Sequence, residues 1–205
     1  MKKFELTNEF ITNMFGTKLF RIRALVEFGD VEAGELGGYV EKESNLGHDD
    51  NAWVYDNAWV YGNARVYGDA QVSGDARVYG NARVYDNAWV YGNARVCGDA
   101  RVCGNARVCS DALVCGNARV CSDEDYAYAH GFGSVNRTTT FFRLKDGGVG
   151  VRCGCFYGTL AQFRDKIRET HGETKKAQEY LMLADLMELR FEEDENEVGN
   201  RKYVE

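Results

Sequence analysis

A six-residue unit repeats twelve times without a break between Asn51 and Ser122. Most copies read Asn/Asp-Ala-(Arg/Trp)-Val-(Tyr/Cys)-(Gly/Asp/Ser), and valine returns at every sixth position from Val54 to Val120. A unit this short cannot bury its apolar side chains alone, so it has to stack on its neighbours. The repeat therefore predicts a solenoid.

The order of residues within each unit predicts how the coil is built. Because side chains alternate across a strand, Ala and Val fall on one face and Arg/Trp and Tyr/Cys on the other. The following Gly, Asp or Ser, with the next Asn or Asp, suits a corner because these residues tolerate positive φ or bond to their own backbone. Four-residue strands with two-residue corners give a triangular coil of three units, and stacked coils make a prism roughly 20 Å long.

Each aliphatic residue is followed four places later by a small one, as in the pairs Val54 and Ala58 and Val60 and Ala64. This pattern resembles the hexapeptide-repeat left-handed parallel β-helix. The stretches Gly29-Asp30-Val31 and Leu36-Gly37-Gly38-Tyr39-Val40 look like the entry segment of bacterial and phage β-helix proteins, which are described as transferase-like or polymer-forming. The resemblance implies the fold and a phage or mobile-element origin, and it implies no established reaction.

The chain divides into four parts, and together they predict a mainly β protein with about four to five coils. Residues 1–50 are expected to form an N-terminal β cap and an irregular first coil, and residues 51–122 the β-helix. Residues 123–137 are predicted to be a linker. Residues 138–205 are expected to form a small ββαα module with strands Thr138–Leu144 and Val149–Phe156, a helix capped by Thr159, a second helix Lys175–Phe191 and an acidic tail from Glu192.

Placing the repeat in an 18-residue register predicts three different outer faces. The first carries Arg65, Arg83, Arg101 and Arg119 beside Tyr67, Tyr85, Cys103 and Cys121. The other two contain the tryptophans Trp53, Trp59 and Trp89. Stacked guanidinium groups repel one another, so an arginine ladder needs neighbouring anions or aromatic rings to stabilise it. We expect Asp residues at nearby corners to provide the anions and Tyr or Trp side chains the rings. The alternative is a phosphate-bearing or acidic partner that binds along the ladder.

Composition limits the function classes. The formal charge of -7 argues against general nucleic-acid binding. No apolar stretch is long enough for a membrane helix and no signal-peptide core follows Met1, so a cytoplasmic location is expected. The seven cysteines are an odd number, and five lie in the repeat in place of Tyr. We interpret them as reduced ladder residues, because parallel Cβ directions disfavour a disulfide between stacked neighbours.

The histidines and cysteines are the candidates for catalytic or metal-binding roles. Hexapeptide β-helix acyltransferases use a His as general base and bind acyl-CoA between subunits, and of His48, His130 and His171 only His48 is a candidate for that role. Cys153, Cys155 and His171 form a possible metal trio that lacks a fourth ligand. We predict no catalytic constellation, no metal and no cofactor.

The favoured hypothesis is a non-enzymatic binding or scaffold protein, and the alternative is a CoA-dependent acyltransferase. The expected partners are a host protein or a small anionic ligand, and further copies of the chain in a dimer or trimer formed through exposed aromatic side chains. The predicted contact residues are Arg65, Arg83, Arg101, Arg119, Tyr67, Tyr85, Trp53, Trp59 and Trp89.

Overall fold

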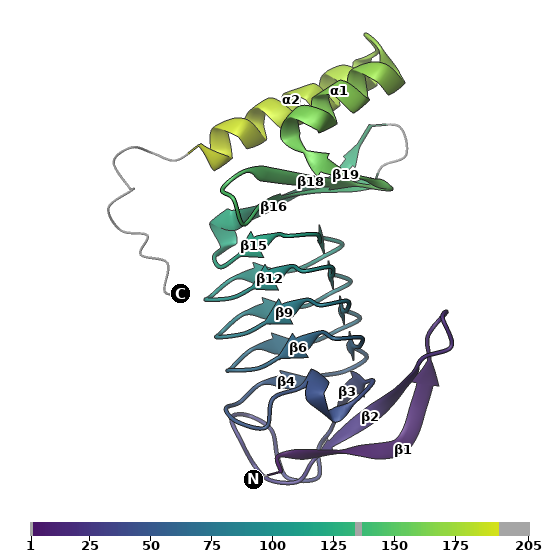
Figure 1. The fold of residues 1–205 in the computed structure, drawn as a ribbon, viewed down its shortest axis with the longest axis vertical. Helices are drawn as coiled ribbons and strands as arrows, with labels where there is room; N and C mark the ends of the chain where they lie inside the picture. The colour runs from purple at the N-terminus through teal and green to yellow at the C-terminus, as the bar shows by residue number, and fades with distance from the viewer. Residues whose placement is uncertain (1, 134–136, 193–205) are drawn as a thin grey trace.

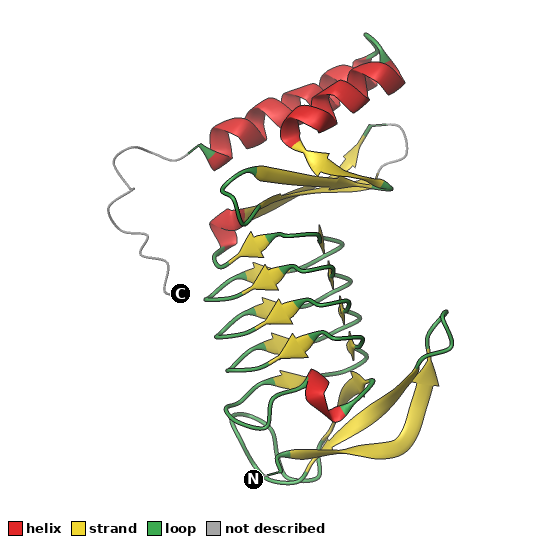
Figure 2. Cartoon of the chain, viewed as in Figure 1, coloured by secondary structure: helices red, strands yellow, loops and turns green. Residues whose placement is uncertain are grey.

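The computed structural model describes residues 2–133 and 137–192. An N-terminal β-hairpin, a column of stacked coils and a C-terminal module of strands and helices follow one another along the long axis of the molecule (Figures 1 and 2). The fold confirms the prediction of a mainly β solenoid with N-terminal strands and a C-terminal two-helix module. Of the predicted acidic tail, Glu193 onward lies outside the described residues.

The N-terminal part begins with two antiparallel strands, β1 (Phe4–Thr12) and β2 (Lys18–Ala24). Strand β3 (Leu36–Val40) pairs antiparallel with β2 on one side and parallel with the solenoid on the other. A short 3₁₀ helix, η1 (Glu43–Asn45), then leads to an isolated bridge between Leu46 and Val66. This segment pairs with β5 and β6, and the solenoid has about five turns.

The repeat forms twelve two-residue strands in three parallel stacks. One stack continues the N-terminal sheet through β5 (Trp59–Val60), β8 (Arg77–Val78), β11 (Arg95–Val96) and β14 (Leu113–Val114). A second contains β4 (Trp53–Val54), β7 (Gln71–Val72), β10 (Trp89–Val90) and β13 (Arg107–Val108). The third contains β6 (Arg65–Val66), β9 (Arg83–Val84), β12 (Arg101–Val102) and β15 (Arg119–Val120).

Alanine and valine fill the inside of every coil, as the alternation predicts. Every repeat Ala and Val is at most 1% exposed, so the apolar contacts run unbroken through the stack. The corners need positive φ: at Gly98 φ is +70°, and a Cβ there would lie 2.8 Å from the backbone nitrogen of Gly116 in the next coil. Asp56 and Asp86 take the same left-handed conformation at other corners, and their carboxylates accept hydrogen bonds from Gly74 and Gly104.

The C-terminal module is a four-stranded antiparallel sheet followed by two helices. Its elements are η2 (Asp123–Asp125), β16 (Tyr126–Phe132), β17 (Arg137–Arg143), β18 (Val149–Cys153), β19 (Phe156–Thr159), α1 (Leu160–His171) and α2 (Lys175–Phe191). Both helices begin after a threonine whose hydroxyl caps the first turn, Thr159 and Thr174. They lie together on the far side of the sheet from the solenoid (Figure 2).

The prediction of a linker between residues 123 and 137 is wrong in its described part. Tyr126–Phe132 is strand β16, paired with β17, so the module has four strands where two were expected. The physical reason is the end of the solenoid: Tyr126 is buried, and its hydroxyl donates to the carbonyl of Arg107 in the last coil. The segment is thus ordered by the coil beneath it.

The two ends of the solenoid carry opposite unsatisfied groups because every strand in it is parallel. Each coil donates its N–H groups to carbonyls of the next coil, as Trp53 does to Ala70 and Arg65 to Ala82. Carbonyls are therefore left at the N-terminal end and N–H groups at the C-terminal end. Different side chains satisfy each set.

Donors cover the N-terminal end. The buried ammonium group of Lys3 donates to the carbonyls of Asp50 at 3.1 Å and Ala52 at 2.8 Å. The buried amide of Asn45 donates to two further carbonyls, at 3.2 and 2.8 Å. The cap thus supplies the hydrogen-bond donors that the backbone of a preceding coil would have supplied.

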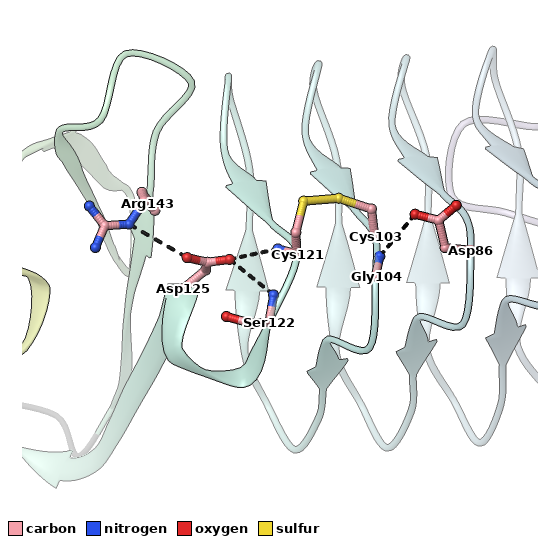
Figure 3. The surroundings of a disulfide bond; sticks show 7 residues. All are labelled: Asp86, Cys103, Gly104, Cys121, Ser122, Asp125 and Arg143. Carbon is pink, nitrogen blue, oxygen red and sulfur yellow. Dashed lines mark hydrogen bonds and ion pairs between the residues drawn. A yellow bond between two sulfur atoms is a disulfide. The ribbon is translucent and has the colours of Figure 1, made fainter. Parts of the chain in front are cut away.

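Acceptors cover the C-terminal end. Asp123 accepts from the backbone N–H of Arg107 at 2.7 Å, and the Thr140 hydroxyl from that of Leu113 at 3.0 Å. One oxygen of Asp125 accepts from two consecutive N–H groups of the last coil, and its other oxygen pairs with Arg143 of β17 at 3.5 Å (Figure 3). All three sheets of the solenoid are therefore capped by the module.

Candidate functional site

The arginine face consists of Arg65, Arg83, Arg101 and Arg119 on β6, β9, β12 and β15. The parallel register sets each arginine directly beside the next. Arg65, Arg83 and Arg101 are exposed, and Arg119 is partly buried near the C-terminal module. The structure thus brings the four predicted residues into one ladder, as the 18-residue register requires.

The expected ion pairs between this ladder and the corner aspartates do not form. In the described part of the chain, Arg65, Arg83 and Arg101 have no carboxylate within 4.0 Å. The corner carboxylates bind along the stack instead, Asp99 to the Asn81 amide at 2.9 Å and others to backbone N–H groups. Among residues 2–133 and 137–192, these three adjacent guanidinium groups therefore have no carboxylate partner.

One arginine on each of the other two faces lies over an aromatic ring, as the sequence led us to expect. The guanidinium of Arg77 lies over the ring of Trp59 at 4.1 Å from its centroid, and that of Arg107 over Trp89 at 5.3 Å. Cation–π contact of this kind is favourable by about 0.5–1 kcal/mol at exposed sites. The arginine face differs because all four of its strands carry arginine and none carries tryptophan. A stack of tyrosines runs beside these arginines, as Tyr61 and Tyr79 do on the face of Trp59.

Tyr67 and Tyr85 form that stack beside the arginines. Their ring centroids are 5.1 Å apart and their planes differ by 3°. Burial raises the pKa of the Tyr67 hydroxyl, while the positive charges of Arg83 and Arg101 act in the opposite direction. The Tyr67 hydroxyl therefore stays protonated at neutral pH and can donate a hydrogen bond to a bound anion.

An open groove of about 580 Å³ lies where the arginine face meets the first coil. Arg65, Arg83 and Tyr67 line one side, and η1 with the following loop lines the other. The contribution of η1, through Glu43 and Ser44, was not anticipated from the sequence. The only sequence signal for it is the six-residue step from Val40 to Leu46, which places η1 over β6.

His48 also lines this groove, but both of its ring nitrogens are engaged. The backbone N–H of Lys3 donates to Nδ1 at 3.2 Å, so the proton lies on Nε2, which donates to Glu43 at 2.9 Å. The ring also stacks on Phe4 with centroids 4.5 Å apart. A hydrogen bond from Lys2 holds the pKa of Glu43 below its ordinary value. His48 is therefore built into the N-terminal cap, with no nitrogen open to a substrate proton.

Trp53 does not belong to the outer aromatic surface that the sequence predicts. It is fully buried, with the ring of Phe28 at 5.3 Å and that of Phe4 at 6.2 Å between centroids. The N-terminal segment folds over the first coil and covers it. Trp59 is partly buried under Arg77, whereas Trp89 is 43% exposed.

The interpretation of all repeat cysteines as reduced is wrong for one pair. A disulfide joins Cys103 and Cys121, whose Cα atoms are 4.3 Å apart on neighbouring coils (Figure 3). The close approach of parallel strands brings the two sulfur atoms together. Cys97, Cys109, Cys115, Cys153 and Cys155 are free thiols.

Cys153, Cys155 and His171 line one cavity of about 250 Å³ in the C-terminal module. Among residues 2–133 and 137–192, no three His, Cys, Asp or Glu side chains are grouped closely enough to hold a metal ion. Cys153 accepts a hydrogen bond from Thr139 at 3.2 Å, which ties it to the sheet. His130, the remaining histidine, contacts Thr138 at 2.9 Å.

The searched part of the structure, residues 2–133 and 137–192, contains no helix long and apolar enough to cross a membrane. Comparison with known proteins concerns the coils. A family model described as the YdcK beta solenoid repeat matches residues 58–74, 70–84, 76–92, 82–98 and 94–110, which is less than half of the chain. No curated protein matches this chain. The repeat match and the three parallel stacks together make this chain a β-solenoid repeat protein.

Proposed function

We propose that the protein is a non-enzymatic binding or scaffold protein whose arginine face holds an anionic partner. The observation that carries this proposal is the ladder of Arg65, Arg83 and Arg101, which are exposed, adjacent and without a carboxylate within 4.0 Å in the described residues. The partner chemistry is an acidic protein segment or a small phosphate-bearing ligand.

Electrostatics favours a multivalent anion. Unit charges ~5 Å apart repel by under 1 kcal/mol in water and by several times that near a protein surface. A ligand that places negative oxygens between the guanidinium groups removes this repulsion and gains charge-assisted hydrogen bonds. The Tyr67 hydroxyl at the same groove adds a neutral donor.

The net charge of the chain and the fixed spacing of the arginines favour a small ligand or a protein partner over a nucleic acid. The formal charge of the chain is -7, so a long nucleic acid laid along the molecule would meet net repulsion. The rigid backbone ladder also fixes the spacing of the arginines before any partner arrives, which reduces the ordering cost of binding.

The test is calorimetric titration with two probes, inorganic pyrophosphate and a hexaglutamate peptide. We expect the double variant Arg83→Ala/Arg101→Ala to bind the preferred probe at least about tenfold more weakly, and raised salt to weaken the wild type likewise. Arg107→Ala is the matched control, because that arginine lies on another face over Trp89. Equal affinity of the wild type and the double variant for both probes would remove the arginine face from this role.

The alternative of acyl transfer has no support from the position of His48, because Nδ1 and Nε2 are both engaged. His48→Ala should therefore weaken the N-terminal cap, by about 1–2 kcal/mol in the free energy of unfolding, and leave pyrophosphate or peptide binding within twofold. Turnover of acyl-CoA that disappears in this variant would reverse the preference.

Self-association as a dimer or trimer is part of the same proposal. Its support is the aromatic patch of Trp89 and Tyr91, which are 43% and 37% exposed. Sedimentation of the wild type and of Trp89→Ser tests it: loss of the oligomer in the variant is expected, and a monomeric wild type would exclude it. The expected cytoplasmic location and phage or mobile-element origin rest on sequence alone.

A further inference from the structure

Two pairs of cysteines occupy equivalent places on neighbouring faces of the same two coils. Cys97 and Cys115 follow β11 and β14, and Cys103 and Cys121 follow β12 and β15, each pair separated by one 18-residue turn. The backbone contacts match as well: Cys97 donates to Val114 at 3.0 Å and Cys103 to Val120 at 2.8 Å. The second pair is a disulfide, whereas the first holds two thiols.

The two thiols of the reduced pair differ in access. Cys97 is partly exposed on the side of the solenoid, whereas Cys115 is only 7% exposed. The C-terminal module covers Cys115, because Tyr157 of β19 reaches the adjacent corner and donates to Asn117 at 3.2 Å. A small oxidant can therefore reach Cys97 first.

The surroundings of Cys97 favour its thiolate. A hydrogen bond with Cys115 lowers the pKa of Cys97 to about 6; burial opposes this, and the Tyr79 hydroxyl and the charges of Arg152 and Arg95 support it. The same bond raises the pKa of the Cys115 thiol. Tyr61 and Tyr157 are the other titratable groups that face the pair, and burial raises the pKa of both.

We propose that Cys97 is a site of oxidation by hydroperoxides, with Cys97 as the attacking thiolate and Cys115 as the resolving thiol. The geometry that carries this is the in-register stacking of two free thiols, one accessible and one covered, beside an equivalent pair that is already cross-linked.

The reaction consumes one hydroperoxide for each disulfide formed. The Cys97 thiolate attacks the terminal peroxide oxygen, the O–O bond breaks, and an alcohol or water leaves with a proton, giving a sulfenic acid on Cys97. The Cys115 thiol then attacks this sulfur, the S–O bond breaks, and water leaves with the thiol proton. Two thiols are oxidised by two electrons in total, and the peroxide is reduced.

Hydrogen peroxide is the probe, and the full-length protein is used. The expected product is lighter by two hydrogens, and trypsin should release a new linked pair of peptides. Cleavage after Arg95, Arg101, Arg107 and Arg119 separates all four cysteines, so this pair is distinguishable from Cys103–Cys121. In Cys115→Ser, a dimedone adduct should accumulate on Cys97, whereas in Cys97→Ser none should form on Cys115.

The pH dependence of Cys97 labelling reports the pKa of its thiol, which solvent exposure of the side chain alone does not set. The rate of iodoacetamide labelling of Cys97 should be half-maximal near pH 6, and Arg152→Gln should move this midpoint upward. The exposed Cys155 serves as the internal reference, and Cys155→Ser should leave the peroxide reaction unchanged. A Cys97 midpoint between about pH 8 and 9, or peroxide treatment without sulfenic acid or disulfide at Cys97, would overturn the proposal.

Discussion

The two ends of the solenoid are closed by opposite chemistry. At the N-terminal end, the ammonium group of Lys3 and the amide of Asn45 donate to open carbonyls. At the C-terminal end, Asp123, Asp125 and Thr140 accept from open N–H groups. The difference follows from one fact, the shared direction of all strands in the stack.

A parallel solenoid therefore has a polarity along its axis, as an α-helix has, with backbone N–H donors and carbonyl acceptors left at opposite ends. In the middle coils, the backbone N–H and C=O groups form hydrogen bonds with the coils on either side. An end coil has a neighbour on one side only, so residues outside the repeat must form the remaining hydrogen bonds. Stability is therefore expected to depend on individual side chains mainly at the two ends.

The largest expected effect is at the N-terminal end. Trp53→Ala should lower the free energy of unfolding by about 3–5 kcal/mol, because it empties a fully buried site between the first coil and the N-terminal segment. Trp89→Ala is the matched control in the regular coils and should cost less than about 1 kcal/mol. Chemical denaturation measures both, and equal losses would contradict the contrast between end and middle.

At the C-terminal end, Asp125→Asn should cost about 2–3 kcal/mol. The change removes a buried charge that accepts from Cys121 and Ser122 and pairs with Arg143. Asp99→Asn, at an exposed corner, is expected to change the stability by less than about 0.5 kcal/mol. Thermal unfolding of the two variants distinguishes them, and a loss at Asp99 as large as at Asp125 would show that the end is not special.

The smallest effect is a pH dependence from Lys3. Burial lowers its pKa from 10.5 to about 8, although Asp50 and other carboxylates oppose the shift. The unfolded chain then binds this proton more tightly, so the cost of keeping Lys3 charged is present below about pH 8 and is removed as the pH rises toward 10.5.

The stability of the wild type relative to Lys3→Met should therefore rise with pH across this window. The expected rise is on the order of 1 kcal/mol, after allowance for solvent screening. Taking the difference between the two proteins cancels the titration of Tyr and Cys side chains that they share. A difference that is flat, or that falls over this range, would contradict the assignment of a buried ammonium cap.

Much of the fold follows from the repeat. The periods of six and 18 residues place every Ala and Val inside and set the arginine ladder in register, because these depend only on strand alternation and stacking. The helix Leu160–His171 follows from its cap at Thr159, and the helix Lys175–Phe191 from its apolar spacing. Local rules and periodicity suffice for these parts.

The parts that sequence did not reveal depend on contacts between distant segments. Trp53 is buried because Phe4 and Phe28 fold over it, and the repeat alone gives it the same environment as Trp89. Strand β16 lacks a local signal because its order comes from β17 and from the last coil. Arg65, Arg83 and Arg101 lack ion pairs with the corner aspartates because those carboxylates accept hydrogen bonds from the neighbouring coil instead. The direction of a corner side chain cannot be read from the repeat.

The division of the coils into three faces restricts how this chain can change in length. A gain or loss of 18 residues adds or removes one strand in each of the three stacks. The N-terminal and C-terminal caps then still contact the same three stacks as before. A change of six residues would rotate the C-terminal module by one side of the triangle, so that Asp125 and Thr140 would meet corners and strands that they do not match. Evolution of this chain by insertion or deletion inside the repeat should therefore proceed in whole turns.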